Sequence, residues 1–393
     1  MEFVYWLFWG LRSVFSIFPV EVALTLGLVF FGLSWIRRRP IVSLPASGRR
    51  RKLLRWLGIG GALAIVTVAT ATTWLSYLHT FPDPSGFGGW LRRPLPLVTV
   101  ALVVTAFAIA LRLEPLPAPG ERKIAPRQWW WTFVPPPLLW TTSIATALLL
   151  LTSLWQTAVG TRAPADADLY GNVPSRTDLP VFVPLQENMG YFAGAGWPNH
   201  LATLAAVLLA TAVLIFTLGR DANRPISIRA AASDVRAEHA ATARVLAIIV
   251  LGGILLTLGA VWGHVGYIGG IMVGVDDPPE QGGALTGPVV GSSYQAFAWP
   301  MSVGGYVIQG IGAALLLRLA FDTWRVTRAQ HGSQKPDVPS TESARGSTES
   351  ASAPGTSAGS VQSALPSSPE ALRSVGSDSV PTEPDPIRTE DAR

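Results

Sequence analysis

The sequence predicts an all-α polytopic membrane protein with seven transmembrane helices, and three observations lead to this fold class. Hydrophobic residues make up 49% of the 393-residue chain and charged residues only 14%, against roughly a quarter charged in soluble proteins. The apolar residues occur in blocks of about 20, which is the length that crosses the hydrocarbon layer of a bilayer. Lysine and arginine gather in alternate connections between these blocks, as the positive-inside rule describes.

Composition also limits the chemistry of the chain. There is no cysteine, which excludes disulfides, iron–sulfur clusters and Cys-type zinc sites. Arginine outnumbers lysine 27 to 3, a bias typical of proteins from GC-rich bacterial genomes. The net charge of +5 arises in loops beside apolar blocks, so we expect a lipid bilayer and no nucleic acid as partner. No Walker motif, GxSxG or kinase signature occurs, so no enzyme class is indicated.

The first segment, residues 1–19, is expected to form an interfacial amphipathic helix. Its apolar stretch, 3–18, is too short for a comfortable span and contains a basic residue. One helical stripe collects Tyr5, Trp9, Arg12, Ser13 and Ser16. Such a helix lies in the plane of the outer membrane interface. The alternative is an eighth span, which would move the N-terminus to the cytoplasm.

The transmembrane domain is predicted over residues 20–323. Its seven spans cover 20–36, 56–78, 95–113, 133–158, 200–218, 244–266 and 297–320. The connections on one side hold 21 lysines and arginines, and those on the other side hold 4. The richer side is therefore assigned to the cytoplasm of a plasma-membrane protein. An odd number of spans then puts the N-terminus outside and the C-terminus inside.

Two connections are long enough to have a role of their own. The outer loop 159–199 mixes aromatic residues with glycine and proline turns, and long loops are often functional. We expect it to pack over the outer ends of the spans as a cap or docking surface, with a simple tether as the alternative. The inner loop 219–244 ends in a helical pattern that reads as a charged extension of the sixth span.

Glycines mark a contact face on the last two spans. One face of the sixth span collects Gly252, Gly259, Gly263, Gly266 and Gly270, and Gly305 and Gly312 repeat the spacing in the seventh. Small residues let helix backbones approach closely in lipid. We expect a membrane-protein partner on Gly259, Gly263, Gly266 and Gly270, with a helix of the same chain as the alternative.

Three histidines fall at the outer membrane boundary. His79 ends the second span, His200 begins the fifth and His264 ends the sixth. Neutral imidazoles can ligate a metal or a haem iron, and Asp276, Asp277 and Glu280 follow in the next outer loop. The alternative is ordinary interfacial histidine, because no HxxxH or HExxH spacing occurs. His239 and His331 are interpreted as cytoplasmic surface residues.

Ionisable residues are missing from the middle of every span, which argues against proton-coupled transport. Arg318, near the inner end of the last span, is expected to reach the cytoplasm by snorkelling. A permease or channel would need hydroxyl and amide groups to line its path. The candidates are Thr67, Thr70, Thr73, Thr141, Thr142, Ser143, Tyr306 and Gln309.

The last segment, 324–393, is rich in Ser, Thr, Pro, Glu and Asp. It lacks the apolar residues that would offset its ordering entropy, so we expect a disordered cytoplasmic tail. The leading functional hypothesis is a non-enzymatic accessory or assembly subunit of an envelope complex. The alternatives are a permease or channel-like subunit, and an outer-face metal or haem protein that uses His79, His200 and His264.

Overall fold

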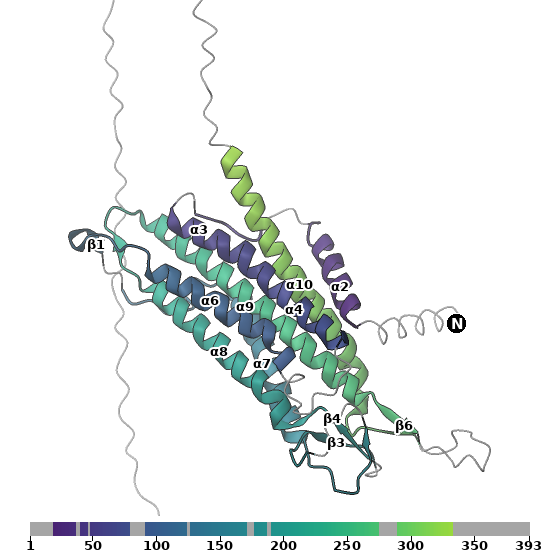
Figure 1. The fold of residues 1–393 in the computed structure, drawn as a ribbon. Coiled ribbons are helices and arrows are strands. Elements are labelled where there is room, and N and C mark those ends of the chain that lie inside the picture. Colours follow the sequence, from purple (N-terminus) through teal and green to yellow (C-terminus); the bar gives the residue numbers. More distant parts are fainter. Residues whose placement is uncertain are drawn as a thin grey trace, which may run out of the picture. The chain divides into compact units, whose positions relative to one another are not determined.

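Helices dominate the computed structural model of the chain (Figure 1). The structure describes residues 19–36, 40–45, 48–78, 91–123, 126–170, 177–186, 190–274 and 289–332. Side chains are not described for residues 19–22, 73–78, 273–274, 289–290 and 330–332. The expected interfacial helix over 3–18, its alternative as an eighth span, and the chain beyond Gly332 lie outside the described residues.

Six helices in the described part of the chain are long and apolar enough to cross a membrane. They are α3 to α4 (Arg49–Trp56, Leu57–Gly61 and Ala62–Leu78), α6 (Leu95–Arg112), α7 (Pro136–Val159), α8 (Gly196–Ala222), α9 (Ala232–Gly269) and α10 (Gln295–Gly332). Each overlaps one predicted span, which confirms a membrane-embedded helical protein. The remaining prediction, 20–36, corresponds to the shorter apolar helix α2 (Pro19–Leu33), which packs beside α10 (Figure 1).

The helix from Arg49 to Leu78 contains one turn of π-helix, η1 (Leu57–Gly61). Such turns widen the backbone locally and often allow a close neighbour. Here the neighbour is α10, because a Cβ on Gly58 would lie 2.5 Å from the hydroxyl oxygen of Thr323. The π turn therefore lets the Thr323 side chain of α10 lie directly against the backbone at Gly58.

The central helix of the bundle is α9. In its most apolar window 83% of residues are buried, against 28% for α7, and it packs on α10, α7, α6 and α8 (Figure 1). Fully buried side chains such as Leu246, Ile249 and Leu258 form the core along its length. Helix α9 begins at Ala232, so the predicted helix of the inner loop is continuous with the sixth span. The loop helix is therefore an extension of that span, as the sequence predicts.

The two ends of the bundle differ, and we name them here. The Arg-rich end holds the start of α3 and the pair β1 (Arg122–Lys123) with β5 (Ile226–Ser227). The sheet end holds β2 (Leu169–Tyr170), β3 (Phe182–Pro184) and β4 (Tyr191–Ala193). Strand β4 lies between the other two, parallel to β2 and antiparallel to β3. A second pair at this end joins β6 (Met272–Gly274) to β7 (Val289–Gly291) (Figure 1).

The loop 159–199 packs against the bundle at the sheet end. Its side chains Val181, Phe182, Val183 and Leu185 are all less than 5% exposed. The loop therefore forms a packed cap in its described residues, so the alternative of a simple tether is wrong there. The end of α7 meets the start of α8 beside this cap, where a Cβ on Gly160 would clash with Cα of Gly196.

Helix α10 ends later than the sequence predicts. It runs to Gly332, past residue 324, where we expected the tail to start. The reason is that Thr323 and Thr327 are buried against the bundle, and each hydroxyl bonds a carbonyl one turn earlier. Threonine-rich, weakly apolar turns of this kind escape a hydropathy window although they pack well.

Candidate functional site

A buried ionic network lies at the Arg-rich end. Nη2 of Arg50, on α3, donates to both carboxylate oxygens of Asp221 on α8, at 2.6 and 2.5 Å. Its Nε donates to the hydroxyl of Thr242 on α9 at 3.0 Å. His239 places Nδ1 3.0 Å from an Asp221 oxygen, and its ring stacks on Phe133. The network thus joins three helices through charges that water does not reach.

Sequence reasoning missed this network and placed His239 on the surface, which is wrong because His239 is 4% exposed. Hydropathy windows ended the fifth span at 218 and began the sixth at 244, so the polar helix ends appeared solvated. A charge can be buried there because an opposite charge on a neighbouring helix compensates its lost hydration. The available signal was an acidic residue, Asp221, just after the apolar block of the fifth span.

A second buried ion pair joins two residues of α10 that are one helical turn apart. Nε of Arg318 is 3.1 Å from Oδ2 of Asp322, which also accepts the backbone N–H of Ile41 at 2.9 Å. The Arg318 guanidinium lies 3.6 Å from the ring centre of Trp35. The expectation that Arg318 snorkels to water is therefore wrong, because it is 3% exposed and the carboxylate at i+4 holds it inside.

At the sheet end the structure places two of the three predicted histidines, since His79 lies outside the described residues. Nε2 of His264, on α9, is 2.7 Å from Nη2 of Arg93 and 3.1 Å from the carbonyl oxygen of Gly194. His200, at the start of α8, is fully buried. Arg93 is close enough for its charge to act on both imidazoles. An arginine, which sequence reasoning did not single out, therefore contacts His264 and lies near His200.

The charge of Arg93 bears on the metal site predicted from the three histidines. No group of three metal-ligating side chains occurs within the part of the chain that the structure describes, so the three-histidine metal site stays a prediction. Burial, with a smaller contribution from Arg92, lowers the pKa of Arg93 to about 9, which still leaves it protonated at neutral pH. A positive charge against His264 disfavours a metal cation there.

Neutral polar side chains are buried at the same end. Gln156 and Ser153 on α7, and Tyr294 just before α10, have side-chain polar atoms without a hydrogen-bond partner. Burial raises the pKa of Tyr294 to about 12, while the neighbouring Gln156 amide acts in the opposite direction. The end of α7 at Gly160 contacts the start of α8 at Gly196, and the two helices run antiparallel. Because Gln156 precedes this contact by as many residues as His200 follows it, the two side chains lie at the same level.

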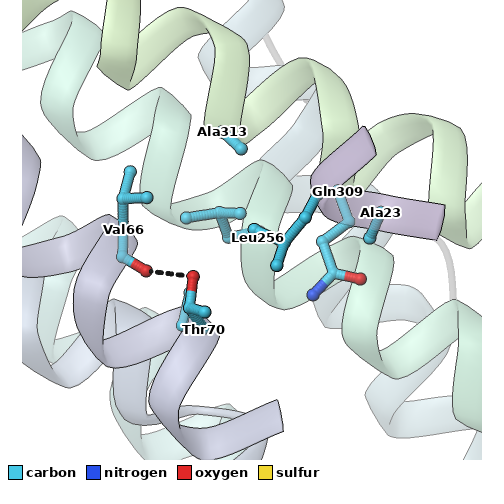
Figure 2. A pocket seen from close by; sticks show the side chains of 8 residues that line it. Ala23, Val66, Thr70, Leu256, Gln309 and Ala313 are labelled. Carbon is cyan, nitrogen blue, oxygen red and sulfur yellow. Dashed lines mark hydrogen bonds between the residues drawn. The ribbon is translucent and has the colours of Figure 1, made fainter. Parts of the chain in front are cut away.

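A small pocket lies between α2, α4, α9 and α10 (Figure 2). Its volume of about 20 Å³ holds about one water molecule. Thr70 and Gln309 line opposite sides of it with Leu256 between them (Figure 2), and the Thr70 hydroxyl donates to the Val66 carbonyl oxygen at 2.9 Å. The pocket is too small for a solute larger than water.

The polar path expected of a permease is not assembled by the residues chosen from the sequence. Thr67, Thr141 and Ser143 are exposed on outer helix faces, and the Thr141 hydroxyl bonds its own helix at the Pro137 carbonyl. Only Thr70 and Gln309 of that set reach the pocket, and the side chain of Thr73 lies outside the description. The hydropathy pattern identified the helices but not which face each turns inward.

The predicted glycine face is confirmed as a helix contact, and its partner is α10 of the same chain. A Cβ on Gly259 would lie 2.5 Å from the carbonyl oxygen of Gly305, and one on Gly266 would lie 2.6 Å from that of Ala298. Gly263 differs, because a Cβ there would meet nothing within 4 Å. At Gly259 and Gly266 this face is therefore occupied from within the chain.

Comparisons of the chain with protein-family models, curated proteins and solved structures find no significant match.

Proposed function

We propose that this chain is a plasma-membrane protein of bacterial type with seven spans, which are the six long helices and the shorter helix α2. Its role is that of a non-enzymatic accessory or assembly subunit of an envelope complex. The observation that carries this proposal is the closed packing of the central helix, in which α9 meets α10 backbone to backbone at Gly259 and Gly266. A helix packed in this way supports a rigid scaffold better than a moving transport pathway.

Two further features support a scaffold. The polar network of Arg50, Asp221 and His239 ties three helices at one end, and the packed cap around Phe182 closes the other. The outward face of α7 is apolar, with Trp140 and Leu151 more than 60% exposed. That face suits lipid or the transmembrane helix of a partner subunit, since both present apolar surface.

Purification in a mild detergent tests the assembly role. A tagged full-length chain is expected to bring down a second membrane protein in a fixed ratio, and the ratio is measured by quantitative mass spectrometry. Replacing the exposed Leu151 by Trp should weaken that association if the α7 face carries it, while Leu102→Trp on α6, 65% exposed, serves as the matched control. A monodisperse monomer without a partner would contradict the proposal.

The proposed topology puts the Arg-rich end in the cytoplasm and the N-terminus outside. Since the chain has no cysteine, single introduced cysteines report their side without background. In intact cells, a membrane-impermeant maleimide is expected to label Ala165→Cys at the sheet end and to spare Ala118→Cys at the Arg-rich end. The reverse pattern would invert the topology.

A permease subunit is the second candidate, and one observation favours it. The buried, partnerless groups of His200, Gln156 and Ser153 lie where α7 and α8 face each other, and such groups mark solute sites in transporters. Solute flux into vesicles that contain the purified protein would support this role. Flux equal to that of empty vesicles would contradict the permease role and leave the scaffold role.

A further inference from the structure

We propose that the sheet end holds a site for a small oxyanion, a carboxylate or a phosphate, which Arg93 binds with His200 and His264 beside it. This site goes beyond the accessory role, and a scaffold with or without a bound anion would meet the earlier proposal equally well.

The first argument is the charge of Arg93. Nη2 contacts His264, while Nη1 is buried and has no hydrogen-bond partner. No carboxylate of the described residues pairs with this guanidinium, whereas Arg50, Arg224 and Arg318 each have one. A buried guanidinium without an opposite charge is costly. An oxyanion would supply that charge and would accept from two N–H groups in the geometry that arginine favours.

The second argument is the hydrogen bonding of the imidazoles. Nε2 of His264 accepts from Nη2 of Arg93 at 2.7 Å, so the same nitrogen cannot also donate to the Gly194 carbonyl at 3.1 Å. Both ring nitrogens of His200 are buried without any partner. One of them carries a proton in the neutral ring, and that N–H is available to an anion. The His200 ring thus lacks an acceptor for its N–H, and a bound oxyanion would be one.

The third argument is the set of neutral groups at the same level. Ser153 carries a buried hydroxyl without a partner. The buried Gln156 amide has Tyr294 as a neighbouring polar group, and Ser153 and Gln156 both lie on the turns of α7 that face the start of α8. Buried polar atoms without partners are rare, and an unseen water or ion is a common explanation. Donors from α7 and α8, together with a cation from the turn before α6, form a shell suited to an anion.

The counter-charge has two conceivable sources, and the experiment separates them. It is either a solute or a carboxylate of the chain itself, for which the sequence offers Asp276, Asp277 and Glu280 in the connection between β6 and β7. Our proposal is the solute. Its test uses the purified full-length protein in detergent, with sodium acetate, sodium phosphate and sodium chloride compared at equal ionic strength.

The readout is the unfolding temperature against anion concentration. Acetate or phosphate is expected to raise it in the wild type and in Arg162→Gln, an exposed arginine at the same end. Arg93→Gln is expected to lose that response, and to unfold in chloride at or above the wild-type temperature because a buried unpaired charge is removed. A response to acetate alone identifies a carboxylate ligand, and one to phosphate alone identifies a phosphate.

His200→Gln and His264→Gln keep the test decisive if Arg93→Gln does not fold, since each is expected to raise the half-saturating anion concentration at least tenfold. Four results would overturn the proposal. The first is a wild type that responds to neither anion, and the second is a response that survives in all three variants. The third is a response that appears only after Asp276→Asn, Asp277→Asn and Glu280→Gln are combined, which identifies the chain's own carboxylates. The fourth is stabilisation by Zn²⁺ that requires both histidines.

Discussion

Arg50 and Asp221 form a buried ion pair that joins α3 to α8, with both Asp221 oxygens within 2.6 Å of the same guanidinium nitrogen. On α9, Thr242 accepts a hydrogen bond from Arg50, and His239 lies within hydrogen-bond distance of Asp221. The pair lies at the end of the bundle where the sequence concentrates its basic residues. It shows that one of those arginines is a structural element of the interior, while others remain in the loops.

Arg50→Gln is expected to lower the free energy of unfolding by about 3–5 kcal/mol, because it leaves the Asp221 carboxylate buried beside a single imidazole. Denaturant unfolding in detergent micelles measures the change. Lys52→Gln, an exposed position on the same helix, should leave the midpoint unchanged. The double variant Arg50→Met with Asp221→Leu should recover much of the loss, and failure to recover would mean that the pair is more than a compensated charge.

Asp322→Ala is expected to be strongly destabilising, because this carboxylate holds both Arg318 and the backbone N–H of Ile41. Asp322→Asn keeps an oxygen for Ile41 but removes the charge, so its loss should be intermediate. The unfolding temperature of each variant measures the effect, and Asp234→Asn, at an exposed acidic position, is the control. Equal losses for Asn and Ala would show that the charge matters and the Ile41 bond does not.

The membrane-length helices were predictable, because a hydrophobic block of about 20 residues has few alternatives to a membrane helix. The burial of individual polar residues was not. Asp221 and Asp322 lie just outside the predicted spans, and an average over a window removes such single residues. Their inward orientation depends on partners on other helices, Arg50 on α3 for one and Ile41 for the other, which a one-dimensional pattern does not pair.

The sheet-end site shows the same limit of prediction from the sequence. The sequence placed His200 and His264 at one membrane face from topology alone, and the structure puts both within the influence of one charge. That charge, Arg93, had been counted only as one of four basic residues on the poorer side. Counting assigns a residue to a side of the membrane, whereas its role depends on whether the side chain turns toward water or toward the bundle.

Tyr294 supplies a pH-dependent prediction. Burial raises its pKa to about 12, above the value near 10 of an exposed tyrosine, so the folded state keeps its proton at a pH where the unfolded state loses it. Stability linked to this group is therefore full below pH 10 and falls as the pH rises from 10 toward 12. Tyr294→Phe should flatten the decline in unfolding temperature over this range, while Tyr267→Phe, at an exposed position of the same end, should not. An unchanged decline in Tyr294→Phe would remove this group from the alkaline response.

Two glycines on one helix should respond to alanine in opposite directions. Gly259→Ala places a methyl group 2.5 Å from the Gly305 carbonyl oxygen and 2.6 Å from the Gln309 backbone nitrogen, so α9 and α10 must separate at a cost of about 1–3 kcal/mol. Gly263→Ala meets nothing within 4 Å and gains up to about 1 kcal/mol of helix propensity. The difference in unfolding free energy between the two variants measures the contact of α9 with α10. Gly263→Ala is the control, because its added methyl group lies on the same helix but meets nothing on α10. Equal effects would mean that α9 and α10 are farther apart in the membrane than this packing requires, and the scaffold proposal would lose its main support.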